Sequence, residues 1–225
     1  MRFKCIIFDL DGTLVDTIGD IAAAMNHALE EGGFPILSQE QYAKIVGNGL
    51  RTLASKALPP EARDEKTVDA AYRSALTYYR DHPADHSRPY PGIPELLAGL
   101  RGKSDRKSAV KTAVLSNKAD HLTQMVIGKF FPPYTFDLVI GERPGIPRKP
   151  DPASTWELIT ELDGSPRETL FVGDSEVDAA TAQAAECSFL GVSWGFRSRA
   201  ALEAAGAGRI IDRPAELWEL LSIRY

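Results

Sequence analysis

Close to its start the chain reads Phe8-Asp9-Leu10-Asp11-Gly12-Thr13, with two carboxylates spaced two residues apart at the end of an apolar run. The run, which begins at residue 5, predicts a buried β-strand. Residues two apart in a strand point to the same side, so the two carboxylates are expected to face together. Asp-Gly turns are also common connections between helices and strands, so this stretch alone does not distinguish a functional site from a simple turn.

The composition is that of an ordinary globular protein with a modest acidic excess. The 225 residues are 44% hydrophobic and 25% charged, with a formal net charge of -5. This length suits one domain with an insert or two modest domains. An acidic chain offers no basic field for nucleic acid and disfavours anionic membrane surfaces, so neither is an expected partner. A phosphorylated or carboxylated substrate would then need local cations or a metal.

The cysteines and the first residues favour a cytoplasmic protein. Cys5 and Cys187 are the only cysteines, which is no disulfide framework. Arg2 and Lys4 precede an apolar stretch that is too short for a signal peptide or a spanning helix. We expect a cytoplasmic location, and monomer and homodimer both stay open.

Apolar runs that predict strands alternate with patterns that predict helices. The predicted strands are residues 5–9, 112–116, 138–141, 169–173, 188–192 and 208–211. The predicted helices are residues 93–100, 119–130, 152–162, 179–186, 198–205 and 214–221. Short apolar runs of this kind are typical of strands covered on both faces. The alternation predicts an α/β protein with a doubly wound, mostly parallel sheet.

Residues 16–89 interrupt this alternation with helical periodicity and no convincing strand. Ser38 with Gln41 forms a possible capping box, and apolar residues recur at helical spacing on either side of it. We predict a helical cap of three to five elements at 16–89, inserted into a core formed by residues 1–15 and 90–225. Residues 116–149 have room for only one helix and one strand. A basic cluster in the loop 101–111 is expected to be a solvated surface.

Polar side chains end three of the predicted strands, which is where open parallel sheets bind ligands. They are Asp9, Asp11, Ser116, Asn117, Asp174 and Asp178. Converging carboxylates repel one another unless a cation lies between them, and oxygen ligands of this kind suit Mg2+. The hydroxyl and turn amides at Ser116 and Asn117 are suited to an anion, although a plain turn has the same residues.

Two further segments carry candidate groups. Lys149 lies between Arg148 and Pro150, where it could present a fixed charge to a phosphate or simply be an exposed lysine. Asp174 and Asp178 are four residues apart, a spacing that puts both on one face of a starting helix. N-capping readily explains one of them and explains the other less well.

These motifs, taken in order, resemble the haloacid dehalogenase superfamily of aspartate-nucleophile phosphotransferases. They are Asp9-Leu10-Asp11-Gly12-Thr13, then Ser116 at a strand end, Lys149 before a helix, and Gly173-Asp174 with Asp178. The chain is most similar to the phosphoglycolate-phosphatase-like branch, which has a helical cap of the C1 type. The resemblance extends from residue 3 to about residue 221.

The resemblance implies roles for the two opening carboxylates. Asp9 would attack phosphorus and form an aspartyl-phosphate, which divides one hydrolysis into two displacements. Asp11 would protonate the leaving oxygen and then deprotonate water. Dehalogenases of the same superfamily lack this second acid, so its presence favours phosphoryl transfer. Thr13 would support the loop after the nucleophile.

The resemblance also implies a metal site and a phosphate site. Mg2+ would be held by the Asp9 side chain, the Asp11 backbone carbonyl and Asp174, with Asp178 orienting these ligands. The transferring phosphoryl oxygens would be held by three residues, which are Ser116, Asn117 and Lys149.

Within the cap, Gly47-Asn48-Gly49-Leu50-Arg51 is the least usual segment, because two glycines interrupt a helical pattern. It predicts either a loop that dips toward the substrate, with Asn48 or Arg51 touching the leaving group, or a simple turn between helices. Trp194, Gly195 and Phe196 are expected either to line the entrance of the site or to pack under a loop.

The resulting expectation is a Mg2+-dependent phosphatase for a small phosphomonoester, with 2-phosphoglycolate as the typical substrate of the branch. A sugar phosphomutase similar to β-phosphoglucomutase, or a pyrophosphatase, would use the same first displacement. A binding module without turnover is a further alternative. The sequence does not choose the physiological substrate, because the shape of the cap loops decides it.

Overall fold

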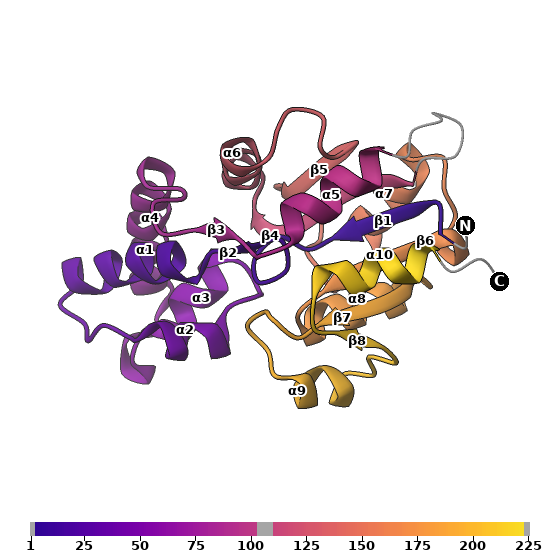
Figure 1. Ribbon diagram of the computed structural model, residues 1–225. Coiled ribbons are helices and arrows are strands. Elements are labelled where there is room, and N and C mark those ends of the chain that lie inside the picture. Colours follow the sequence, from indigo (N-terminus) through magenta and orange to yellow (C-terminus); the bar gives the residue numbers. More distant parts are fainter. Residues whose placement is uncertain (1–2, 103–109, 223–225) are drawn as a thin grey trace.

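The computed structural model describes residues 3–102 and 110–222 and contains a six-stranded parallel sheet joined to a helical cap (Figure 1). The strand order is β5-β4-β1-β6-β7-β8. The strands are β1 (Cys5–Phe8), β4 (Lys111–Ala119), β5 (Leu138–Glu142), β6 (Thr169–Gly173), β7 (Ser188–Val192) and β8 (Ile210–Ile211). From β1 the chain builds β4 and β5 on one side and then returns to build β6, β7 and β8 on the other. This confirms the predicted doubly wound α/β fold.

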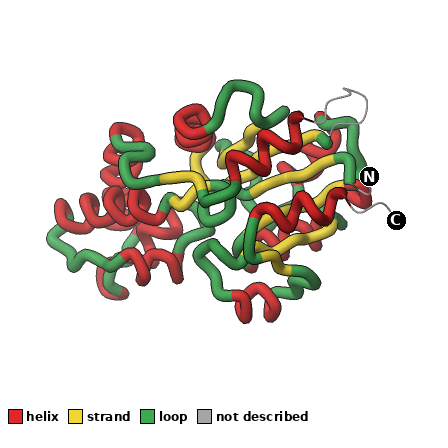
Figure 2. The backbone as a smooth tube through the Cα atoms, in the orientation of Figure 1, coloured by secondary structure: helices red, strands yellow, loops and turns green. Residues whose placement is uncertain are grey.

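Helices cover both faces of the sheet (Figure 2). They are α5 (Ile93–Gly102), α6 (Asp120–Phe130), α7 (Ala153–Glu161), α8 (Glu176–Ala184), α9 (Arg199–Ala204) and α10 (Pro214–Ser222), with a short 3-10 turn η2 (Pro166–Glu168) before β6. Neighbouring residues of β1 pack in different clusters, since Phe8 joins Leu97 of α5 whereas Ile7 joins Leu158 of α7. Burial on both faces explains why the strands read as continuous apolar runs.

The cap has a hydrophobic cluster of its own, which contains Met25, Leu53 and Tyr79. It consists of α1 (Ile18–Glu31), α2 (Gln39–Ile45), α3 (Leu50–Ala57), the 3-10 turn η1 (Pro60–Ala62) and α4 (Glu65–Asp81). The predicted capping box is confirmed at the start of α2, where Ser38 and Gln41 bond each other's backbone N–H groups.

Two short strands connect the cap to the core, and the sequence did not predict them. They are β2 (Val15–Asp16) and β3 (Arg88–Pro89), which pair in antiparallel fashion. Strands of two residues are too short for any periodicity to show. The boundary proposed for the cap at 15/16 falls inside β2, and the one at 89/90 falls directly after β3.

A few other expectations differ from the structure or lie beyond it. Helix α8 begins at Glu176 rather than at residue 179, because Ser175 caps it from the end of β6. Of the basic cluster expected at 101–111, Lys103, Arg106 and Lys107 lie outside the described residues. Across residues 3–102 and 110–222, no helix has both the length and the apolar character that a membrane crossing requires.

Candidate active site

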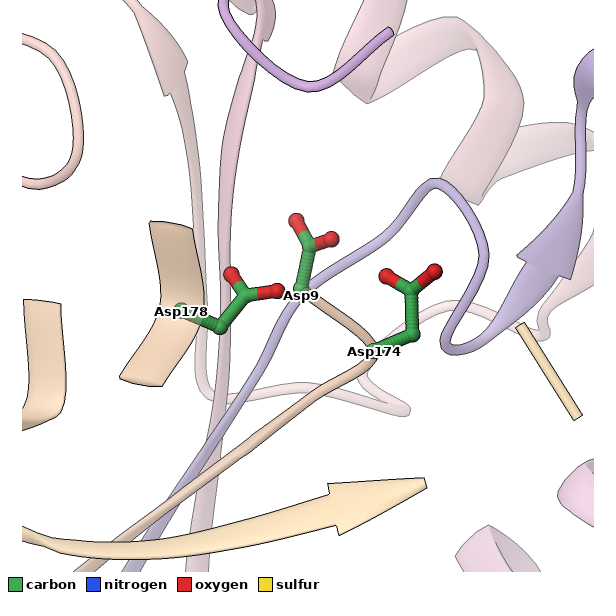
Figure 3. Close-up of side chains that lie close together, drawn as sticks. All are labelled: Asp9, Asp174 and Asp178. Carbon is green, nitrogen blue, oxygen red and sulfur yellow. The ribbon is translucent and has the colours of Figure 1, made fainter. Parts of the chain in front are cut away.

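Three buried carboxylates meet at the carboxyl edge of the sheet (Figure 3). Asp9 follows β1, Asp174 follows the neighbouring strand β6, and Asp178 lies in the first turn of α8. One oxygen from each side chain lies within 4.8 Å of the other two. The parallel register of β1 and β6 brings the two strand ends side by side, as the sequence predicted.

Lys149 is a buried cation that contacts this cluster directly. Its Nζ lies 2.7 Å from Oδ1 of Asp9 and 2.7 Å from Oδ1 of Asp178, and only 3% of its side chain is exposed. Burial alone would lower the pKa of the Lys149 ammonium, but the charges of Asp178 and Asp9 outweigh burial and raise this pKa. The lysine is therefore a fixed positive charge inside the site.

The ammonium of Lys149 does not balance three carboxylates, and the pKa values of Asp9 and Asp174 are both raised. Burial, reinforced by the charge of Asp178, raises the pKa of Asp9 well above its usual value, although Lys149 acts in the opposite direction. Burial and Asp178 likewise raise the pKa of Asp174 to about 7. A divalent cation would restore the balance, and clustered carboxylate oxygens are the donors that Mg2+ takes. The donor set thus fits the predicted metal.

Asp178 is engaged on both of its oxygens. Oδ1 faces Lys149, while Oδ2 accepts hydrogen bonds from Ser175 Oγ at 2.6 Å and from the Ser175 N–H at 3.1 Å. The second bond completes a capping box at the start of α8. Asp178 therefore caps its helix and at the same time orients Lys149.

Asp11 lies beside a second buried lysine that sequence reasoning missed. Its Oδ1 accepts a hydrogen bond from Thr17 Oγ1 at 2.7 Å, and its Oδ2 lies 3.1 Å from Nζ of Lys118. The same ammonium donates to the hydroxyl of Tyr79, a cap residue, at 2.6 Å. The only signal in the sequence is that Lys118 follows Ser116 and Asn117; its contact with Tyr79 reaches across to the cap.

Ser116 and Asn117 end up in different environments. Ser116 is buried and lines the cavity, and its Oγ accepts the N–H of Lys118 at 3.1 Å. The amide of Asn117 donates to the carbonyl of Lys149 at 3.0 Å and to that of Gly47 at 2.9 Å, and it accepts the Lys149 N–H at 2.9 Å. The Asn117 side chain thus holds Lys149 and the cap turn, which leaves its amide no donor for a phosphate.

The loop after Asp9 passes close to Asp174. Gly12 has a φ of +90°, and a Cβ atom there would overlap the carboxylate of Asp174. Only glycine meets both demands at this position. The next residue, Thr13, has a buried Oγ1 without a hydrogen-bond partner among the described residues, and its carbonyl accepts the indole N–H of Trp194 at 3.0 Å.

The glycine segment of the cap forms a turn between α2 and α3 whose backbone lines the cavity at Gly47 and Gly49. The side chains that the sequence singled out lie elsewhere. Arg51 pairs with Asp69 of α4 at 2.8 Å, and neither Arg51 nor Asn48 is among the described residues that line the cavity. The segment is therefore a turn between two helices, and its backbone also forms part of the cavity wall.

Core and cap together enclose a cavity of about 790 Å3, counting its open mouth. This is within the range of small-molecule sites, which is roughly 300–1,000 Å3. The floor carries the charged groups of the core. The cap side is largely apolar, and besides the backbone at Gly47 and Gly49 it consists of Ile21, Val46, Leu50, Leu53, Tyr72, Leu76 and Tyr79.

The sequence and the structure of this chain are both similar to those of known hydrolases. Residues 6–192 match the family model of haloacid dehalogenase-like hydrolases. The chain is 32% identical over 223 residues to a phosphoglycolate phosphatase of Chromobacterium violaceum, an alignment that covers 98% of this chain and 97% of the relative. It is 31% identical to a phosphoglycolate phosphatase of Haemophilus influenzae, with 98% and 99% covered. Among solved structures, a predicted phosphoglycolate phosphatase from Haemophilus somnus superposes with a TM-score of 0.89 at 28% identity and covers 99% of both chains. The chain belongs to the haloacid dehalogenase-like hydrolase family.

Proposed function

We propose that this phosphoric monoester hydrolase is a Mg2+-dependent phosphatase that acts on a small substrate such as 2-phosphoglycolate. The observation that carries the proposal is the meeting of Asp9 with Lys149 and Asp174 at the floor of a capped cavity. The relatives named as phosphoglycolate phosphatases support the substrate class. A cytoplasmic location and a domain division at 16–89 belong to the same proposal.

The proposed metal ligands are the carboxylates of Asp9 and Asp174 and the backbone carbonyl of Asp11. Bound Mg2+ would neutralise the acidic cluster and the phosphate charge. Asp178 would act through Lys149, which it contacts at 2.7 Å, rather than as a direct ligand.

Asp9 is the proposed nucleophile. Its carboxylate attacks phosphorus, the bond between phosphorus and the leaving oxygen breaks, and Asp11 gives its proton to that oxygen. In the second displacement Asp11 takes a proton from water as the water oxygen attacks the aspartyl-phosphate, which releases phosphate and regenerates Asp9. Thr17, at 2.7 Å from Asp11, orients the acid, and Thr13 supports the intervening loop.

The proposed phosphoryl site consists of Lys149, the Ser116 hydroxyl and backbone N–H groups at the end of β4. Lys149 already lies within hydrogen-bond distance of Asp9, so it can contact an oxygen of a phosphoryl group attached there. Asn117 would position Lys149 through the two bonds that join its amide to the Lys149 backbone. Cap residues would decide which leaving group fits, and Asn48 and Arg51 would contribute only after a movement of the cap.

The test is phosphate release across a panel of small phosphomonoesters, with Mg2+ and with EDTA. We expect Mg2+-dependent turnover of 2-phosphoglycolate by the wild type, and loss of turnover in Asp9→Asn with the fold retained by circular dichroism. Turnover that survives Asp9→Asn would show the mechanism to be wrong. Folded wild-type protein without turnover on any substrate would favour the binding-module alternative.

Product analysis separates the remaining alternatives. With a hexose 1-phosphate as substrate, an isomerised sugar phosphate would identify a phosphomutase, whereas free phosphate identifies a phosphatase. Hydrolysis of pyrophosphate in preference to monoesters would identify a pyrophosphatase.

A further inference from the structure

The segment Trp194-Gly195-Phe196-Arg197, between β7 and α9, touches three parts of the proposed site at once. Trp194 donates its indole N–H to the loop after the nucleophile, at the carbonyl of Thr13. The backbone N–H of Phe196 donates to Oδ2 of Asp174 at 2.6 Å, and the Phe196 ring packs against the hydrophobic cluster of the cap. A single residue, Phe196, therefore contacts both a proposed metal ligand and the cap.

Arg197 continues this contact into the cap backbone. Its Nη2 donates to the carbonyl of Val46 at 2.7 Å, and its Nη1 donates to the carbonyl of Ala43. Ala43 lies in the last turn of α2 and Val46 is its C-cap residue, and carbonyls at a helix C-terminus lack partners within the helix and carry partial negative charge. Arg197, a core residue, thus supplies the C-terminal cap of a helix in the other part of the molecule.

The guanidinium of Arg197 is held in place from the core side. Its Nε lies 2.9 Å from Oε2 of Glu176, the first residue of α8, and 13% of its side chain is exposed. Glu176 follows Ser175, which itself follows Asp174. The arginine is therefore fixed to the same strand end that carries the acidic cluster.

Gly195 makes this segment tight. A Cβ atom at residue 195 would overlap Asp174 and the carbonyl of Gly12. The backbone consequently presses directly on the carboxylate-bearing residue and on the nucleophile loop. Because Gly195 has no side chain, a movement of this backbone would act on Asp174 directly.

We propose that Arg197 is a positioning residue that couples docking of the cap to the orientation of Asp174. When the cap is docked, its α2 carbonyls hold Arg197, and the neighbouring Phe196 N–H holds the Asp174 carboxylate in its ligand orientation. Coupling of this kind is reciprocal, so metal bound at Asp174 also favours the docked cap. The inference rests on the proposed function, because it takes Asp174 to be a metal ligand.

The test compares Arg197→Gln with Arg199→Gln, without substrate. Arg199 is the matched control, since it is two residues away and pairs with Asp212 on the exposed surface at 2.6 Å. Arg197→Lys keeps the charge but reaches fewer acceptors than a guanidinium does. Hydrogen exchange of amides in residues 42–53 reports cap docking, and titration calorimetry with Mg2+ reports the metal site.

In Arg197→Gln we expect faster exchange in residues 42–53 and an Mg2+ affinity lower by about fivefold or more, the lower end of usual coupling factors. Arg197→Lys should lie between this variant and the wild type, and Arg199→Gln should match the wild type in both measurements. Faster exchange with unchanged Mg2+ affinity would refute the coupling, and so would unchanged exchange. A wild type that binds no Mg2+ would refute the proposed function as well, which separates the two failures.

Discussion

Replacing Lys149 with methionine removes a buried positive charge and keeps nearly the same side-chain length. The ammonium lies 2.7 Å from Asp9 and 2.7 Å from Asp178, with 3% of the side chain exposed. Loss of one partner from a buried ion pair costs about 3–5 kcal/mol, because the other charge stays buried without compensation. We therefore expect Lys149→Met to lower the free energy of unfolding by about 3–5 kcal/mol at pH 8 in EDTA.

The loss should be smaller at pH 5.5. The pKa of Asp9 is already raised by burial and by Asp178, and removal of Lys149 raises it further, so the folded variant takes up a proton as the pH falls. Proton uptake neutralises one of the carboxylates that the substitution leaves without a partner. Each unit by which the substitution raises the pKa of Asp9 within this pH window corresponds to about 1.4 kcal/mol of difference between the two pH values.

Urea denaturation followed by circular dichroism measures both effects, with Mg2+ added in a second series. Mg2+ should restore part of the lost stability, because a cation returns to the acidic cluster. Lys111→Met is the control, since Lys111 is 43% exposed and lies 3.4 Å from Asp163; such surface pairs contribute about 0–1 kcal/mol. A Lys149→Met protein as stable as the control at pH 8, or equally destabilised at both pH values, would refute the reasoning.

Two further predictions concern other buried charges of the site. The pKa of Asp174 is about 7 in the folded protein against 3.8 ordinarily, so between these values the folded state binds more protons than the unfolded state does. The free energy of unfolding in EDTA should therefore fall as the pH rises from 5 to 7, and saturating Mg2+ should flatten this slope. Urea denaturation that gives rising stability over this window would contradict the prediction. Tyr79→Phe removes the hydroxyl that accepts from Lys118 at 2.6 Å, and loss of a hydrogen bond to a charged group costs about 1.5–3 kcal/mol. Thermal denaturation at matched pH checks this value, and Tyr134→Phe, at an exposed tyrosine, should leave the melting temperature unchanged.

The strand ends could be predicted from the sequence because parallel topology alone brings them together. Asp9 and Asp174 follow runs of continuous apolar residues, and adjacency of β1 and β6 requires no knowledge of side-chain geometry. The family resemblance added the order of the motifs. Fold class and the meeting of these carboxylates were therefore accessible from the sequence.

Contacts made by the docked cap could not be predicted in this way. Lys118 meets Tyr79 across 39 positions of the sequence, and Arg197 meets Val46 across 151. Such pairs depend on how the cap docks on the core, and the local sequence pattern around either residue does not contain this information. Asn117, which the sequence suggested as a phosphate ligand, likewise donates its side-chain amide across to the cap at Gly47, and it also donates to Lys149 of the core.

The antiparallel pair of β2 and β3 has a consequence for the evolution of this architecture. Val15 pairs directly with Pro89, so the chain leaves the core and returns to it one strand spacing apart. A segment attached in this way can be lengthened, shortened or exchanged without displacing any strand of the six-stranded sheet. Substrate range can then diverge through the inserted segment while the acids and lysine beneath it keep their places.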